Sequence, residues 1–133
     1  MDIALCNIDM ITRIVKYAGA NRPLWVIRKG HTTVEEIKGT KTAIGGLTND
    51  NQHFDIHEII LQQGDTFYIC TDGFADQFSG QGKKLTTKKF KEILLSIQGK
   101  SMQEQEKYLN NFIINWQAET EQIDDILVIG VRL

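Results

Sequence analysis

The chain has 133 residues and a formal net charge of −2, with 41% hydrophobic and 24% charged residues. This length suffices for a domain with a buried core, and the balanced charge gives no basic field to attract nucleic acid or anionic lipid. No apolar run approaches the roughly 18 to 20 residues that span a bilayer, and the N-terminus does not resemble a signal peptide. We therefore expect a cytoplasmic protein that contacts neither nucleic acid nor membrane.

The first half of the chain is typical of short antiparallel strands. Residues 3–9 and 13–20 are rich in apolar or β-branched side chains and are separated by a short turn, which predicts a hairpin. Pro23 cannot donate a hydrogen bond to a sheet, so the next strand should begin at or just after it. Residues 24–30 and 33–39 predict a second hairpin.

A polar loop and two further strands are predicted in the middle of the chain. Residues 40–53 are rich in glycine, asparagine and aspartate, which is loop composition. Residues 54–63 resume an alternating strand pattern. A turn at Gly64 then leads into the most apolar strand, 66–70, and residues 80–84 are expected to form a flexible connection.

The last third changes to a helical period. In residues 86–99 apolar side chains recur at i, i+3, i+4 and i+7, which places them on one face of a helix. A second helix is predicted to open at Ser101, where Glu104 completes a capping box. The chain closes with an apolar strand, 124–133, whose first two residues are aspartates. This order predicts a single α+β domain that is mostly antiparallel.

Carboxylates adjoin two of the predicted strands. Asp72 follows the strand 66–70, and Asp124 and Asp125 precede the apolar part of the last strand. If these strands are antiparallel neighbours, the carboxylates converge at one sheet edge, where such a cluster holds a proton or a cation. Carboxylate oxygens favour Mg²⁺ or Mn²⁺, and Gly73 would let the backbone come close to a ligand. The residues alone leave open the alternative of turn aspartates beside core strands.

Three stretches of the sequence, in this order, resemble a known family. They are YAGANRPLWVIRKG (17–30), GDTFYICTDGFADQ (64–77) and QIDDILVIGVRL (122–133). They are similar to motifs of bacterial metal-dependent (type 2C) serine/threonine protein phosphatases of the SpoIIE-like branch, and the likeness covers the whole chain. The resemblance implies an antiparallel β-sandwich flanked by helices, and hydrolysis of phosphoserine or phosphothreonine by a metal-activated water.

The resemblance also implies roles for individual residues. Asp72 and Asp124 correspond to metal ligands, while Asp125 stands where relatives often have asparagine and is a less favoured ligand. A complete domain of this family is expected to hold two Mn²⁺ or Mg²⁺ ions and no catalytic residues apart from the metal ligands. Gly73 and Asp76 are candidates for the substrate side of the site. Asp76 and Gln77 follow the motif in a loop that could face the substrate, but a solvated loop is the favoured interpretation.

Two departures from the family pattern change the expectation for this chain. A complete domain is longer, and a Gly-Asp motif in its first half supplies the aspartate that bridges the two ions. No such motif precedes Met1, so we expect residues 1–133 to be the C-terminal portion of a phosphatase domain, with little or no activity by itself. Leu127 stands where the family usually has serine or threonine.

The resemblance further implies the partners. They are a phosphorylated regulatory protein of the anti-sigma-antagonist type and upstream sensor domains, and exposed sheet edges would favour a homodimer. A non-catalytic regulatory or protein-binding module on the same scaffold is the main alternative. An unrelated α+β domain with turn aspartates is the third.

Overall fold

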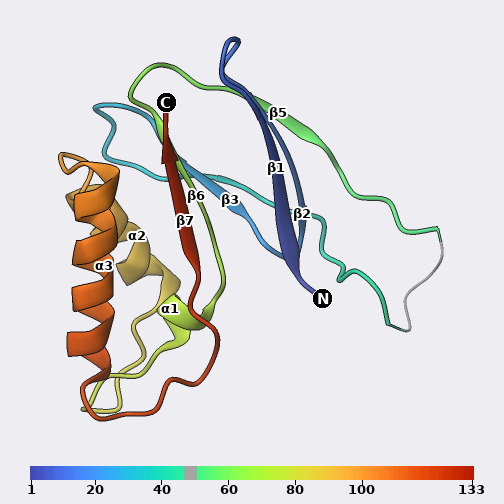
Figure 1. The fold of residues 1–133 in the computed structure, drawn as a ribbon. Helices are drawn as coiled ribbons and strands as arrows, with labels where there is room; N and C mark the ends of the chain where they lie inside the picture. The colour runs from blue at the N-terminus through green and yellow to red at the C-terminus, as the bar shows by residue number, and fades with distance from the viewer. Residues whose placement is uncertain (47–50) are drawn as a thin grey trace. The chain divides into compact units, whose positions relative to one another are not determined.

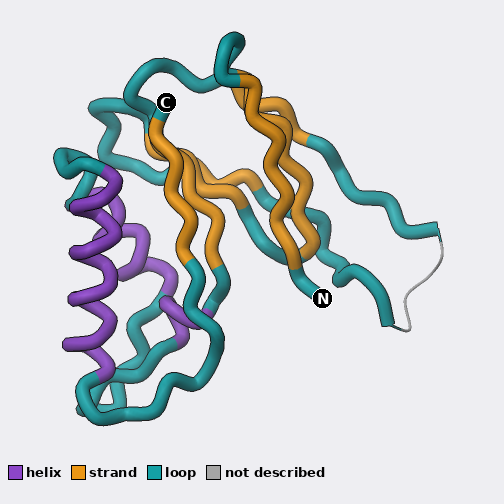
Figure 2. Tube along the Cα trace, in the orientation of Figure 1, coloured by secondary structure: helices purple, strands orange, loops and turns teal. Residues whose placement is uncertain are grey.

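The computed structural model describes residues 1–46 and 51–133 and divides into two compact units. Unit 1 comprises residues 1–69 and 130–133, and unit 2 comprises residues 70–129. Most of the strands belong to unit 1 and all described helices to unit 2 (Figure 1, Figure 2). The α+β class predicted from the sequence is confirmed. Part of the predicted polar loop, residues 47–50, lies outside the described residues.

A three-stranded sheet in unit 1 has the strand order β1-β2-β5. β1 (Ile3–Asp9) and β2 (Ile14–Ala20) form the predicted antiparallel hairpin, and β5 (His57–Ile60) pairs antiparallel with β2. β5 begins later than predicted, because the amide of Asp55 donates to Thr40 Oγ1 in the preceding loop instead of a neighbouring strand. The start of the predicted strand at residue 54 was therefore wrong.

A four-stranded sheet has the order β4-β3-β6-β7. β3 (Leu24–Ile27) starts directly after the only proline, as predicted, and pairs antiparallel with both β4 (Glu35–Ile37) and β6 (Thr66–Cys70). β7 (Val128–Arg132) completes the sheet beside β6. Both predicted hairpins of the first half are thus confirmed, with β4 shorter than its sequence pattern suggested.

β6 and β7 run antiparallel, as the site prediction required. In unit 1 the amide of Leu133 donates to the carbonyl of Asp65 at 3.1 Å, and in unit 2 the amide of Thr71 donates to the carbonyl of Leu127 at 3.0 Å. β7 nevertheless begins only at Val128, so the prediction of a strand from residue 124 was wrong. The amide of Asp125 is held by the neighbouring Asp124 side chain, which removes it from the ladder.

The core of unit 1 lies between inward-facing residues of the two sheets. Alternation along β1 and β2 sends every second side chain inward. The fully buried members are Val15, Tyr17, Leu24, Val26, Ile59, Leu61 and Phe67. Because both sheets contribute to one core, unit 1 is an antiparallel sandwich.

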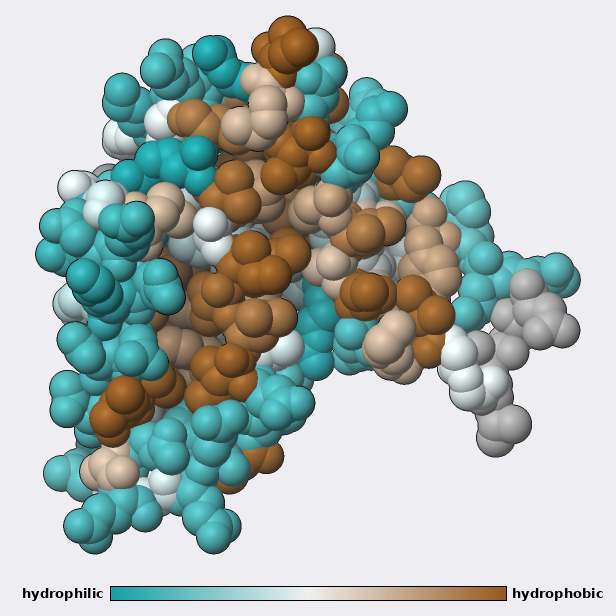
Figure 3. Space-filling view, in the orientation of Figure 1, coloured by the Kyte–Doolittle hydropathy of each residue, from teal (hydrophilic) through white to brown (hydrophobic). Residues whose placement is uncertain are grey.

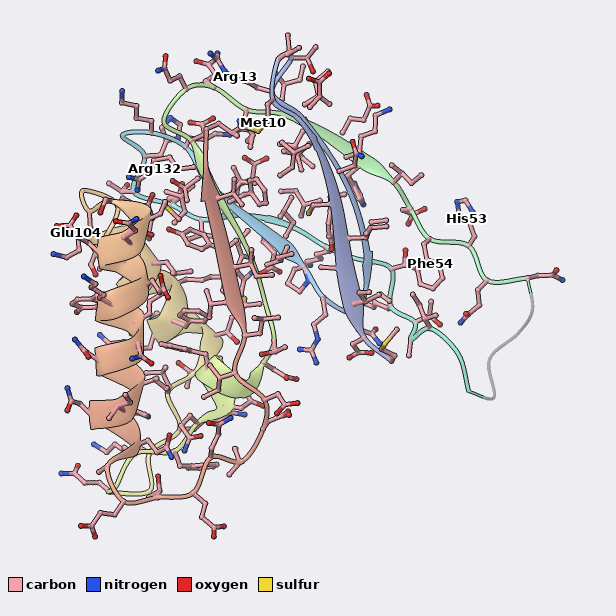
Figure 4. All side chains as sticks on the ribbon, viewed as in Figure 1. Met10, Arg13, His53, Phe54, Glu104 and Arg132 are labelled. Atoms are coloured by element: carbon pink, nitrogen blue, oxygen red, sulfur yellow. The ribbon has the colours of Figure 1, made fainter. Side chains whose placement is uncertain are left out.

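Three helices form the body of unit 2. α1 (Gly73–Asp76) is too short to leave a periodic pattern and was not predicted. α2 (Thr87–Ser96) and α3 (Met102–Gln117) agree with the helical periods of the sequence. The predicted capping box of Ser101 and Glu104 is present at the start of α3, where Glu104 is labelled in Figure 4.

The connection before α2 is a hydrogen-bonded turn, although the sequence suggested a flexible segment. The amide of Ser79 donates to the carbonyl of Lys83, and the amide of Gly82 donates to the carbonyl of Ser79, both at 2.8 Å. Within the described part of the chain, no helix has the length and apolar character needed to cross a membrane.

A buried carboxylate joins three backbone segments of unit 1. Only 3% of Asp65 is exposed, and its oxygens accept hydrogen bonds from the amides of Lys29 and Gln62 and from Arg28 Nη1 at 2.8–3.1 Å. Burial by itself raises the pKa of Asp65, but the two amides and the Arg28 guanidinium outweigh it, so the pKa lies below its ordinary value. The same guanidinium group donates to the carbonyl of Ile60. Asp65 therefore fixes the turn between β5 and β6 to the end of β3.

Replacing Asp65 should destabilise the chain in a pH-dependent way. Asp65→Asn is expected to lower the free energy of unfolding by roughly 2–4 kcal/mol at neutral pH, because it leaves buried donors unsatisfied. A carboxyl group with a lowered pKa in the folded state stabilises above the ordinary value of about 3.9 and loses that contribution as the pH falls through the folded-state pKa. Urea denaturation should therefore show the wild type and the variant converging in acid.

The exposed carboxylate of Asp55 offers a matched control. Asp55→Asn changes a side chain that is 67% exposed and only 3.8 Å from His53, so its effect should be within about 0.5 kcal/mol. Equal stabilities of Asp65→Asn and Asp55→Asn at neutral pH would contradict this account of Asp65.

Candidate metal centre

Thr71 joins the end of β6 to the segment that precedes β7. Its hydroxyl group donates to the carbonyl of Asp125 at 2.7 Å and accepts the amide of Leu127 at 2.9 Å. With the backbone bond between Thr71 and Leu127, three hydrogen bonds connect residues that lie 54 to 56 positions apart. Thr71 thus brings the segment carrying Asp124 and Asp125 beside Asp72.

Gly73 is the position where the two segments approach most closely. A Cβ atom built on Gly73 would lie 2.4 Å from the carbonyl oxygen of Asp125 and 3.1 Å from that of Asp124. Such distances are too short for any side chain, so glycine is required by the space. The sequence had suggested that Gly73 lets the backbone come close to a ligand, whereas the group that approaches its Cβ position is the backbone of Asp125.

Asp72 stands at the N-cap of α1, yet its side chain makes no capping hydrogen bond. Its carbonyl oxygen accepts the amide of Asp76 at 2.9 Å, which closes the first turn. A turn aspartate in this place would ordinarily use its carboxylate to satisfy a helix amide. Capping therefore does not explain why an aspartate stands at this position.

Asp124 and Asp125 are both exposed, on a segment whose backbone is held on both sides. One carboxylate oxygen of Asp124 accepts the amide of Asp125 at 2.7 Å, and the Gln122 side chain donates to the carbonyl of Asp124 at 2.8 Å. Asp72 is half-buried beside them. The structure thus brings the backbones of Asp72, Asp124 and Asp125 together at one end of β6, while the convergence of their carboxylates on a cation stays a prediction.

The donors fit a hard divalent cation in chemistry but are few in number. Carboxylate oxygens suit Mg²⁺ and Mn²⁺, which ordinarily take six ligands with water completing the shell. Among the described residues, no group of three or more His, Cys, Asp or Glu side chains is placed to hold a metal ion. Two carboxylates with water would therefore be a weak site that further ligands could complete.

The two residues that end α1 have different environments. Asp76 is partly exposed and forms an ion pair with Lys84 Nζ at 2.9 Å, so its carboxylate is engaged at the surface. Gln77 is fully buried, which corrects the expectation that it belongs to a solvated loop. Its backbone carbonyl accepts the indole NH of Trp116 at 3.1 Å.

Sequence reasoning missed two residues that contact the segment carrying Asp124 and Asp125, Thr71 and Gln77. Both lie inside the motif stretch 64–77, but neither residue type indicates by itself which distant backbone group it contacts. Their partners, Asp125 and Glu121, lie more than forty positions away in the sequence. Only the fold shows these contacts.

Comparisons with known proteins bear on the family and the fold of this chain. The sequence matches the model of a protein family described as Stage II sporulation protein E (SpoIIE) over residues 1–133. No curated protein sequence matches the chain significantly. Among solved structures, the SiaA-PP2C domain of Pseudomonas aeruginosa is 31% identical, with a TM-score of 0.87; the match covers 99% of this chain and 51% of that one.

Two other solved structures share the fold at lower identity. The phosphatase domain of SpoIIE from Bacillus subtilis is 19% identical with a TM-score of 0.65, covering 99% of this chain and 56% of that one. The RsbU and RsbW domains of a Mycobacterium tuberculosis protein are 18% identical with a TM-score of 0.72, and the match covers 98% of this chain and 35% of that one.

The antiparallel sandwich followed by helices is the fold of type 2C phosphatase domains. Within that class, the chain belongs to the SpoIIE family, which confirms the resemblance seen in the sequence. The chain spans about half the length of the solved domains from Pseudomonas and Bacillus.

The close contact at Gly73 gives a testable prediction. Gly73→Ala should lower the free energy of unfolding by about 1–3 kcal/mol, because the added methyl group overlaps the carbonyl of Asp125 and must push that segment away. Gly99→Ala is the matched control, since a Cβ atom there meets nothing within 4 Å. Thermal unfolding of both variants tests this, and equal effects would show that the Gly73 contact is relaxed at no cost.

Proposed function

We propose that residues 1–133 are the C-terminal portion of a metal-dependent protein phosphatase domain that hydrolyses phosphoserine or phosphothreonine on a regulatory protein. Membership of the SpoIIE family supports a phosphatase role. The observation that carries the proposal is the contact of Gly73 with Asp125, because it places two acidic segments at one point of the fold. In isolation the chain is expected to turn over little substrate.

Asp72 and Asp124 would hold the divalent ion, with Asp125 as a less favoured ligand. Asp72 lies directly before Gly73, which the Asp125 backbone approaches, and Asp124 is exposed on a segment fixed by Thr71. When bound, Mn²⁺ or Mg²⁺ would supply an activated water and neutralise charge on the phosphoryl group. No catalytic residue separate from the ligands is proposed, and a complete domain would hold two ions. A Bacillus relative is described as soaked with manganese and another relative, RsbX, as a complex with magnesium.

Two further residues are proposed on the substrate side of the centre. Gly73 follows Asp72 directly and is proposed beside the phosphoryl group through its backbone, since the space of its missing side chain is taken by the carbonyl of Asp125. Asp76 ends α1 at the surface, and its ion pair with Lys84 balances its own charge. A phosphorylated side chain, which carries about two negative charges, would still be repelled by Asp72, Asp124 and Asp125 unless the cation offsets their charge.

The surroundings of the domain are proposed from its relatives. One of them joins an RsbU domain to an RsbW domain, which supports a phosphorylated partner of the anti-sigma-antagonist type. Upstream sensor domains would control such an output domain, which we expect to act in the cytoplasm.

A metal titration tests the proposed site. Asp72→Asn should raise the dissociation constant for Mn²⁺ by roughly tenfold or more, about 1.4 kcal/mol or above, because it removes one of two charged ligands. Asp55→Asn, in the other unit, should leave it unchanged. Isothermal titration with Mn²⁺ measures both, and equal constants in the two variants would contradict Asp72 as a ligand. Fast hydrolysis of a phosphoserine peptide by the 133-residue chain would contradict its expected low activity.

A non-catalytic binding module on the same scaffold is the second candidate. It is favoured by the absence, in the described residues, of any cluster of three potential metal ligands, and by Leu127 in place of a serine or threonine. A wild-type chain that binds no Mn²⁺ at millimolar concentration would support this candidate.

Self-association through β1 is proposed as a property of the chain. β1 lies at the end of the strand order β1-β2-β5, and edge strands offer unpaired backbone groups to another chain. Ala4, Cys6 and Ile8 pack on the core, whereas Leu5 points away and is 66% exposed. Apolar atoms are exposed over this region in Figure 3. A second copy could pair with this edge.

Sedimentation velocity tests the homodimer. The wild type should show a dimer fraction that grows with concentration, and Leu5→Lys should remain monomeric, because a charge on an edge strand opposes pairing. Ile11→Lys changes an exposed side chain in the turn after β1 and should behave as the wild type. A wild type that stays monomeric at high concentration would contradict the proposal.

A further inference from the structure

Gln77 is a buried polar residue that links four segments of unit 2. None of its surface is exposed. Its amide donates to the carbonyl of Gly73 at the start of α1, and its carbonyl accepts the amide of Leu85, both at 3.0 Å. The same carbonyl accepts the indole NH of Trp116 from α3. Its side-chain Nε2 donates to the carbonyl of Glu121 at 3.0 Å.

The bond to Glu121 reaches the segment that carries the candidate metal ligands. This segment leaves α3 and is held at Glu121 by Gln77 and at Asp125 by Thr71. Asp124 lies between these two points. Because a short segment fixed at both ends retains few conformations, both contacts determine where the Asp124 carboxylate lies relative to Asp72.

One atom of Gln77 argues against a role in packing alone. Its Oε1 is buried and has no hydrogen-bond partner among the described residues. A buried polar atom without a partner costs free energy, so an apolar side chain of similar volume would pack here without that cost. An apolar residue cannot supply the Nε2 donor of glutamine, which bonds the carbonyl of Glu121 at 3.0 Å and that of the adjacent Phe78 at 3.2 Å.

We propose that Gln77 is a positioning residue, which sets the place of Asp124 relative to Asp72 through its hydrogen bond to Glu121. The inference rests on the proposed function, because fixing Asp124 relative to Asp72 serves a purpose when the two residues form a metal centre. In this role Gln77 contacts neither the metal nor the substrate.

Two glutamines of unit 2 make a matched pair of variants. Gln77→Met removes the donor and also the unpartnered acceptor at nearly constant volume. Gln105 is likewise buried, and its Nε2 donates to the carbonyls of Ile97 at 3.1 Å and Lys100 at 3.3 Å, away from the aspartates. Gln105→Met therefore repeats the chemical change without touching the 121–125 segment. Gln77→Asn is a second test variant, because its amide is one methylene too short to reach Glu121.

Amide hydrogen exchange, followed by NMR on the full chain without metal, decides the inference. The amides of Asp125 and Leu127 should exchange roughly tenfold faster or more in Gln77→Met and Gln77→Asn than in Gln105→Met, because their segment opens locally. Unchanged exchange in the folded Gln77 variants would overturn the positioning role. Unfolding of both Gln77 variants with a folded Gln105→Met would overturn it too, in favour of a structural role.

Mn²⁺ as a paramagnetic probe separates this inference from the proposed function. In the wild type, Mn²⁺ should broaden the amide signals of Asp72 and Asp124. Gln77→Met should need about a tenfold higher Mn²⁺ concentration than the wild type for the same broadening, and Gln105→Met should need the wild-type concentration. If the wild-type signals broaden and Gln77→Met and Gln105→Met need the same Mn²⁺ concentration for this broadening, the positioning role is overturned. A wild type without broadening would contradict the proposed metal centre, whereas metal-free exchange still decides the placement of Asp124.

Discussion

The arrangement of the candidate site depends on one steric constraint, the approach of the Asp125 backbone to Gly73. A Cβ atom at Gly73 would overlap the carbonyl of Asp125, so the two segments can meet only where a glycine stands. The hydroxyl group of Thr71 then fixes the approaching segment with two hydrogen bonds. The backbones that carry the aspartates are thus brought together by this contact and by the Thr71 hydrogen bonds.

Unit 2 supports this contact with a compact apolar and polar interior. Phe74 follows Gly73 in α1 and stacks on Phe90 of α2 with ring centroids 4.2 Å apart, and on Phe112 of α3 at 6.3 Å. Gln77 completes the connection from α1 to the segment after α3. Exposed carboxylates on a buried scaffold are what a metal centre needs, since the ligands must be accessible while their positions are fixed.

In unit 1 an ion pair between the buried Asp65 and the partly exposed Arg28 holds the turn before β6. Arg28 Nη1 donates to Asp65 at 3.1 Å and to the carbonyl of Ile60 at 2.7 Å, so charge and backbone are satisfied together. Tyr17 adds a second buried polar contact, in which its hydroxyl group donates to the carbonyl of Arg22. Burial raises the pKa of Tyr17 to about 12, which keeps the phenol neutral and able to donate. Both contacts join a loop to a strand, and they fix the position of the loop more closely than apolar packing alone would.

Much of this protein was determined by local sequence. Alternation of apolar residues predicted both hairpins of the first half, the helical period and the Ser101 capping box predicted α3, and motif order predicted the SpoIIE family. The convergence of Asp72 with Asp124 and Asp125 could be anticipated from two strand ends. Tertiary structure alone decided where β7 begins and which residues hold the aspartates. Thr71 and Gln77 act on partners far along the chain, and a contact between distant residues leaves no periodicity in either one.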